Sequence, residues 1–139
     1  MVRYEFRAFQ TARLGIVYRP FIRVKLQHGP YSISEEFLVD AGADVTLIPL
    51  RIGKALCLPP PEAGEIFPLG GIGGVVPAVY RKVNMQIGNY HLEGRIAWAQ
   101  SGNIPLLLGR VDVFDFFKIT FDQTDRVTIF TRKKKAART

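Results

Sequence analysis

Apolar residues recur at every second position along much of the chain, which is the pattern of half-buried β-strands. In residues 21–27, the alternating apolar positions are Ile22, Val24 and Leu26. Residues 79–98 alternate in the same way on both sides of a Gly88-Asn89 turn, which predicts a β-hairpin. The predicted buried face of its first strand is Val79, Arg81, Val83, Met85 and Ile87. A last pair of strands is predicted at 117–121 and 126–130, joined by the polar stretch 122–125.

Helical signals are short. Pro49 suits the first position of a helix of one or two turns that ends at Leu56. A second short helix is predicted over residues 109–117, where apolar residues recur at every third position. Gly/Pro-rich segments at 59–61 and 70–74 interrupt the pattern, and neither recurs as a repeat. The chain is therefore predicted to be all-β, a single-domain barrel or sandwich with one or two short helices.

The length of the chain limits the kind of site it can build. It has 139 residues, of which 47% are hydrophobic, and this describes one compact domain rather than a disordered chain. An active site that needs two full lobes must therefore be completed by a second copy or by a partner.

The formal net charge of +7 suggests an anionic partner such as nucleic acid, but its distribution weakens that interpretation. Residues 132–139 carry five positive charges and no negative ones, and residues 1–25 carry six positive charges against one negative. The remaining residues, 26–131, carry eight positive and eleven negative charges, a net of −3. The basic residues thus gather at the ends, where a solvated tail and a functional basic arm are both open interpretations.

Several classes of protein are disfavoured by what the sequence contains. Cys57 is the one cysteine, so no disulfide forms within the chain. His28 and His91 have no Cys or His neighbours at ligand spacing, so no metal site is expected. The longest uncharged apolar stretch, 67–80, is too short and too rich in Gly and Pro to span a bilayer, and the N-terminus lacks a signal-peptide core. We expect a cytoplasmic protein that is not bound to a membrane.

Three segments are candidates for chemistry. Asp40 follows the apolar residues 37–39 and precedes Gly42, which places a carboxylate at the end of a strand beside a residue that permits a tight turn. Residues 70–74 hold four glycines around Ile72, and no Lys-Ser/Thr or helix follows them, so a phosphate-binding loop is disfavoured and a mobile hairpin tip is favoured. Arg110 follows an apolar strand and Gly109, where it can pair with a carboxylate. Taken singly, the Asp40 and Arg110 segments are better explained as an ordinary turn and an ordinary strand end, and residues 70–74 are also consistent with a flexible surface turn.

Together, in this order, the three segments resemble the retropepsins, the retroviral-type aspartic proteases. Residues 39–44, with Thr46, resemble the family's catalytic Asp-Thr/Ser-Gly-Ala-Asp loop; residues 70–74 are similar to its flap tip, and 106–110 to its apolar-apolar-Gly-Arg segment. The resemblance spans about residues 21–130 and implies a closed barrel. We accordingly expect an N-terminal extension at 1–20, a protease domain at 21–131 and a basic tail at 132–139.

The resemblance implies an aspartic endopeptidase that is a homodimer with one catalytic Asp per chain. Residues 40–42 hold the one Asp-x-Gly of this sequence, whereas a two-lobed enzyme needs two. Two Asp40 carboxylates across a two-fold axis would share a proton and activate a water, and neither a metal nor an organic cofactor is implied. The other roles implied are substrate contacts by Gly42, Ala43, Asp44, Gly71, Ile72 and Gly73, with Ala41 and Arg110 supporting the site and Arg110 pairing with Asp44.

Ala41 departs from the family pattern, which has Thr or Ser with a hydroxyl that bonds across the dimer axis. The loss of this hydroxyl is expected to lower the stability of the loop and of the dimer by about 1 kcal/mol or more per lost buried hydrogen bond. Ala41 is compatible with a weakly active natural variant, a non-catalytic peptide-binding or dimerising relative, or an engineered substitution.

A nucleic-acid-binding barrel is the second alternative class, and no nucleic acid partner is expected on the main interpretation. It rests on the basic residues 133–135 and on Phe114, Phe116 and Phe117. The spacing of these phenylalanines and the adjacent apolar run are more typical of a core than of a base-stacking strand face.

Overall fold

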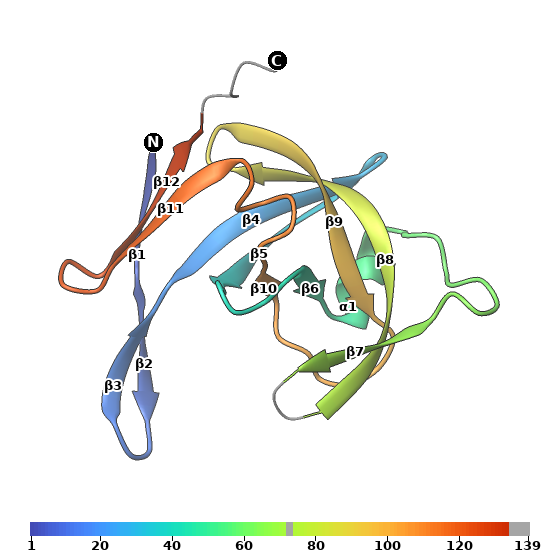
Figure 1. Cartoon of the computed structure of the whole chain (residues 1–139), viewed down its shortest axis with the longest axis horizontal. Coiled ribbons are helices and arrows are strands. Elements are labelled where there is room, and N and C mark those ends of the chain that lie inside the picture. Colours follow the sequence, from blue (N-terminus) through green and yellow to red (C-terminus); the bar gives the residue numbers. More distant parts are fainter. Residues whose placement is uncertain (72–73, 134–139) are drawn as a thin grey trace.

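The computed structural model describes residues 1–71 and 74–133, which form twelve β-strands and one short helix (Figure 1). Six strands close into a barrel in the order β4, β5, β10, β6, β9, β8, because β8 pairs with β4 as well as with β9. Their bounds are β4 Phe21–His28, β5 Tyr31–Val39, β6 Thr46–Ile48, β8 Gly74–Ile87, β9 Tyr90–Ala99 and β10 Leu107–Leu108. Strand β7, Phe67–Gly71, pairs with β8 and extends the sheet beyond the ring. The predicted all-β barrel is confirmed.

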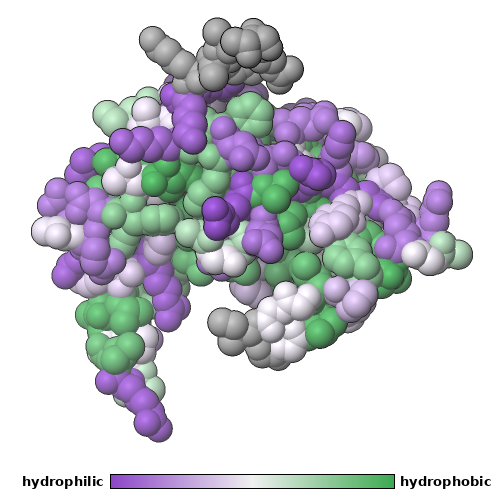
Figure 2. Space-filling model, in the orientation of Figure 1, coloured by the Kyte–Doolittle hydropathy of each residue, from purple (hydrophilic) through white to green (hydrophobic). Residues whose placement is uncertain are grey.

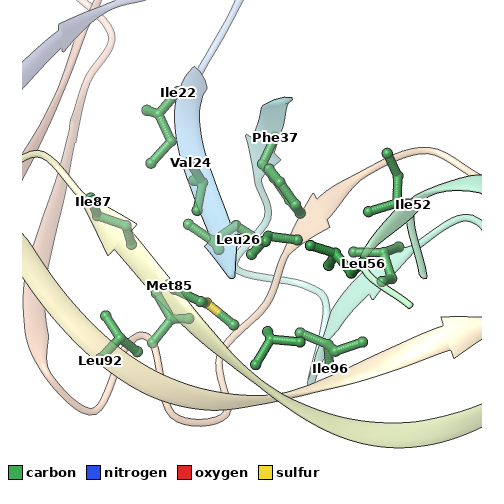
Figure 3. Packing of buried hydrophobic residues seen from close by; sticks show 14 of the residues in the cluster. Ile22, Val24, Leu26, Phe37, Ile52, Leu56, Met85, Ile87, Leu92 and Ile96 are labelled. Atoms are coloured by element: carbon green, nitrogen blue, oxygen red, sulfur yellow. The ribbon is translucent and has the colours of Figure 1, made fainter. Parts of the chain in front are cut away.

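Alternate residues of the strands fill the barrel, as the sequence pattern predicts. Ile22, Val24 and Leu26 of β4 are at most 2% exposed and point toward residues of β5, β8 and β9 across the interior (Figure 3). Full burial of each such aliphatic side chain stabilises the fold by roughly 1.5–3 kcal/mol. The labelled residues of this core are Ile22, Val24, Leu26, Phe37, Ile52, Leu56, Met85, Ile87, Leu92 and Ile96.

The predicted helix after Pro49 is present as α1, Leu50–Ala55, with Pro49 as its N-cap rather than as its first helical residue. Its residue Gly53 lies against the ring of Trp98, where an added Cβ would come within 2.1 Å of the indole. The indole Nε1 donates to the carbonyl of Leu50 over 3.1 Å. The glycine therefore permits the close approach that seats the helix on β9.

The prediction of a second helix over residues 109–117 is wrong. Residues 111–116 form turns, although the amide of Phe114 donates to the carbonyl of Arg110 in one helix-like bond of 2.9 Å. Asp112 has a φ of +68°, a left-handed conformation that a right-handed helix does not accommodate. Its carboxylate also accepts hydrogen bonds from the backbone and side chain of Arg95, so tertiary contacts override the threefold spacing.

The two ends of the described chain meet in a second sheet. Strand β12, Val127–Arg132, lies between β1, Val2–Glu5, and β11, Phe117–Asp122, which confirms the last predicted strand pair. The rings of Phe117 and Phe130 lie 5.3 Å apart beneath this sheet and join it to the barrel core. Phe114 and Phe116 pack against the same core, which is unlike a base-stacking platform.

Residues 1–20 form β1 and a separate hairpin of β2, Arg7–Thr11, and β3, Gly15–Arg19. The division of the chain at residues 20 and 131 stays a prediction, and residues 134–139 of the basic tail lie outside the described residues. Within the described ranges, no helix, α1 included, is long and apolar enough to cross a bilayer.

Candidate active site

Asp40 lies where strand β5 ends, beside the short strand β10. Leu108 pairs with Val39 in parallel register, and the amide of Asp40 donates to the carbonyl of Leu108 over 3.0 Å. The amide of Val39 donates to the carbonyl of Pro20 over 2.9 Å. The backbone that carries the carboxylate is therefore fixed by neighbours on two sides.

The loop that follows Asp40 folds back onto the carboxylate. The amide of Gly42 donates to Asp40 Oδ1 over 2.9 Å, and the amide of Ala43 donates to the carbonyl of Asp40 over 3.1 Å. A Cβ at Gly42 would lie 3.2 Å from Asp40 Oδ1, tighter than an ordinary contact. Glycine thus lets the loop approach the carboxylate, and one oxygen of Asp40 is oriented by backbone.

Position 41 points no hydrogen-bonding group at this loop. Ala41 and Gly42 are exposed, Asp40 is half-buried, and Asp44 is exposed. Asp40 does not line the shallow hollow formed by Lys82, Glu93, Gly94, Arg95 and Asp112. In a single chain the carboxylate therefore lies on an open face rather than in an enclosed cleft.

The Gly109-Arg110 segment lies directly against this loop. The amide of Gly109 donates to Thr46 Oγ1 over 3.0 Å, and an added Cβ at Gly109 would lie 2.3 Å from the carbonyl carbon of Val45. The amide of Arg110 donates to the carbonyl of Ala43 over 2.9 Å. Backbone contacts thus bring together two of the three predicted segments, the Asp40 loop and the Gly109-Arg110 segment. A side chain at position 109 would prevent this close approach.

The side-chain pair expected between Asp44 and Arg110 is not formed. Both side chains are exposed, and no ion pair within 4.0 Å joins these two described residues. Exposed pairs gain little in water, so the fold does not depend on this contact. The amide of Val111 instead donates to the carbonyl of Asp44 over 2.8 Å, and backbone bonds connect the two segments.

The sequence reasoning did not find the support that Thr46 gives. Thr46 is fully buried, and its hydroxyl accepts the hydrogen bond from the amide of Gly109. A hydroxyl placed between two apolar residues of a strand is the signal for such a role, because a buried hydroxyl needs a partner.

The glycine-rich segment forms the end of a β-hairpin, with Gly70 paired with Val75 and Gly71 with Gly74. An added Cβ at Gly70 or Gly71 would meet no atom within 4 Å, so contacts with the described residues do not explain these glycines. Ile72 and Gly73, predicted to touch substrate, lie outside the described residues.

Arg81 fastens the base of this hairpin to the loop that follows α1. Its guanidinium donates to Glu65 Oε1 over 3.0 Å and to the carbonyls of Pro59 and Pro60 over 3.0 and 3.1 Å. The hydrogen bond from Arg81 lowers the pKa of Glu65 below its ordinary value. The sequence placed Arg81 on the inward face of β8 but did not identify its partners.

Comparison with known proteins supports the fold. No protein-family model matches the chain, and no curated protein matches it. Among solved structures, the chain is similar to the EIAV protease complexed with the inhibitor HBY-793, with a TM-score of 0.53 and 23% identity over 72% of this chain and 88% of that chain. The nearly all-β architecture with a closed six-stranded barrel matches the retropepsin-like fold.

Proposed function

We propose that the protein is an aspartic endopeptidase that acts as a homodimer, with Asp40 from each chain as the catalytic pair. The observation that carries this proposal is the placement of Asp40 at the end of β5, with one carboxylate oxygen bonded by the amide of Gly42 and the loop face open. The sequence contains one Asp-x-Gly, so a pair of such loops requires two chains.

The chemistry follows from bringing two carboxylates together. Two such groups in hydrogen-bond contact share one proton, because like charges at that distance disfavour double ionisation. The ionised Asp40 takes a proton from a water as this water attacks the peptide carbonyl, and the protonated Asp40 donates to the carbonyl oxygen. The proposed reaction uses neither a metal nor an organic cofactor.

The substrate in this proposal is an extended peptide. It would lie between the Asp40 loops and the β7–β8 hairpin and bind mainly through backbone hydrogen bonds, as peptides do when they add to strand edges. Gly42, Ala43 and Asp44 would contact its main chain, and the β7–β8 hairpin, including Gly71, Ile72 and Gly73, would close over it. The exposed glycines of β7 support this role, since they leave backbone groups accessible.

A second candidate function is favoured by Ala41, which supplies no hydroxyl to the loop. In that case the protein would be a non-catalytic domain of the same fold that dimerises or holds peptides. The two candidates share the dimer and differ in whether peptide bonds are cleaved.

Cleavage of a mixed peptide library between about pH 4 and 7 tests the proposal, because a shared-proton pair loses function when both groups are protonated or both ionised. We expect the wild-type chain to cleave peptides with a maximum inside this range, and Asp40→Asn to abolish cleavage. Equal cleavage by Asp40→Asn would exclude Asp40 as the catalytic group. No cleavage by either protein would favour the non-catalytic candidate.

A further inference from the structure

The β2–β3 hairpin stands clear of the barrel (Figure 1). Within the described ranges its two strands pair with each other and with no other strand. Near its turn, Leu14 is 79% exposed and Ile16 is 57% exposed. The space-filling view shows the hairpin projecting at the lower left, with apolar surface along it and an open space beside it (Figure 2). The turn of the hairpin therefore presents two large apolar side chains to solvent.

The base of the hairpin is anchored, so the direction in which it projects is fixed. Arg7 forms an ion pair with Glu36 of β5, and the ring of Phe9 lies 5.2 Å from the ring of Phe21. On the other strand, β3, the ring of Tyr18 lies 3.7 Å from the guanidinium of Arg126. These contacts hold the part nearest the barrel and leave the apolar turn in solvent.

The hairpin leaves the barrel next to the Asp40 loop. It joins β4 through Pro20. The carbonyl of Pro20 accepts a hydrogen bond from the amide of Val39, the residue before Asp40. Each of its strands has five residues and therefore spans roughly 17 Å. Figure 1 shows it and the β7–β8 hairpin extending toward the same side, with the end of β5 between them. A molecule that docks on the open face of Asp40 would thus meet this hairpin.

The Asp40 loop, residues 40–45, is short compared with the number of residues that a stable dimer interface uses. Specific interfaces bury about 800 Å² on each partner, from roughly 20–30 residues. Strand β12 is paired on both sides, by β1 and β11, and these two strands form the edges of that sheet. The β2–β3 hairpin adds the thirteen residues from Arg7 to Arg19 to the same side of the molecule.

We propose that the β2–β3 hairpin is a dimerisation arm that docks its apolar turn against a second copy of this chain. The proposal rests on the proposed function for the position of the two-fold axis near Asp40. It goes beyond it in assigning the contact to a hairpin that contains no catalytic residue.

Sedimentation equilibrium of the full chain tests this proposal. We compare the wild type with a Leu14→Ser, Ile16→Ser double variant, and Ile66→Ser serves as the matched control. Ile66 is 50% exposed and lies in the loop before β7, so its change removes one exposed aliphatic side chain at another place, comparable with the change at Ile16. We expect the double variant to raise the dimer dissociation constant about tenfold or more, and the control to leave it unchanged. A photoreactive residue at position 14 is expected to cross-link two chains of the wild type.

The same measurements on Asp40→Asn separate this proposal from catalysis, since that variant keeps the hairpin intact. An arm-dependent dimer supports the arm even where no peptide is cleaved. A dimer that the double variant leaves equally tight, or cross-links to a different protein or to substrate peptide alone, would overturn the arm and leave the catalytic proposal standing. A monomeric wild type at all concentrations would overturn both.

Discussion

At position 41 the loop carries a methyl group next to a carboxylate that is otherwise held by backbone. The amides of Gly42 and Ala43 donate to Asp40 within the same loop, and Ala41 itself is exposed. An exposed methyl group at the proposed axis neither donates nor accepts, so two loops that meet there would lack a side-chain hydrogen bond between them. The local fold of the loop does not depend on residue 41, whereas contact between two loops does.

Ala41→Thr is therefore expected to raise peptidase activity and tighten the dimer. A net gain of about 1 kcal/mol for one buried hydrogen bond corresponds to roughly a fivefold change in the dimer equilibrium. Peptide cleavage and sedimentation of the same samples check this. Ala41→Val is the matched control, because it adds similar volume without a hydroxyl. An equal gain in both variants would assign the effect to packing and contradict the hydrogen-bond argument.

At the scale of elements, Arg81 connects the base of the β7–β8 hairpin to the loop of residues 56–66. Its bonds to Glu65 and to two proline carbonyls hold a segment that has no strand or helix of its own. The proposed closing motion needs a fixed base, and this ion pair with its backbone contacts provides one.

This attachment is expected to weaken in acid. The pKa of Glu65 is lowered from 4.5 by its hydrogen bond with Arg81, so the carboxylate stabilises the folded state above pH 4.5. That contribution is lost as the pH falls through the lowered value and Glu65 takes up a proton. The thermal midpoint of Glu65→Gln should therefore lie below that of wild type at pH 7, and the difference should shrink below pH 4.5.

The control for this prediction is Glu93→Gln, which removes a looser pair with Lys82 at 3.9 Å. It is expected to change the midpoint little at either pH, because exposed ion pairs contribute little. Hydrogen exchange of residues 56–66 provides a second measurement. A difference between Glu65→Gln and wild type that stays constant down to pH 3 would contradict the assigned role of Arg81.

Strands could be predicted from the sequence where one face is buried and the other is wet. In β4, β8 and β9, successive side chains point alternately into the barrel and toward solvent, so apolar and polar residues mark the buried and exposed faces. Strand β10 has two residues and takes its shape from its neighbours, which leaves little alternation to read. The missing second helix has a similar cause, since the left-handed Asp112 is stabilised by Arg95, a residue distant in sequence.

The site could be predicted in part for a related reason. Asp40, Gly42 and Gly109 are recognisable in sequence, and the structure brings their segments together. The contact with Thr46 and the fastening by Arg81 join residues far apart in the chain, and neither residue type signals its partner. The expected pair of Asp44 and Arg110 is not formed within the single chain, where both side chains are exposed and such a pair gains little in water, and its role at the site stays a prediction.

At the scale of the whole molecule, the chain forms one barrel with one Asp40 loop on an open face. This barrel carries one such loop, so the proposed chemistry requires a second Asp40 loop, which we propose comes from a second chain. The β2–β3 hairpin and the β7–β8 hairpin extend toward the same side, with the end of β5 between them (Figure 1), and this is the side that a second copy would complete in the proposed dimer.

Mixing active and inactive chains tests this central claim most directly. Wild-type protein at fixed concentration is titrated with Asp40→Asn chains, and the rate of peptide cleavage is followed after exchange of subunits. If each active unit needs an Asp40 from both chains, the rate should fall as mixed dimers form, and a large excess of the variant should suppress it almost completely. A rate that stays constant throughout the titration would show that one chain is sufficient and would contradict the account.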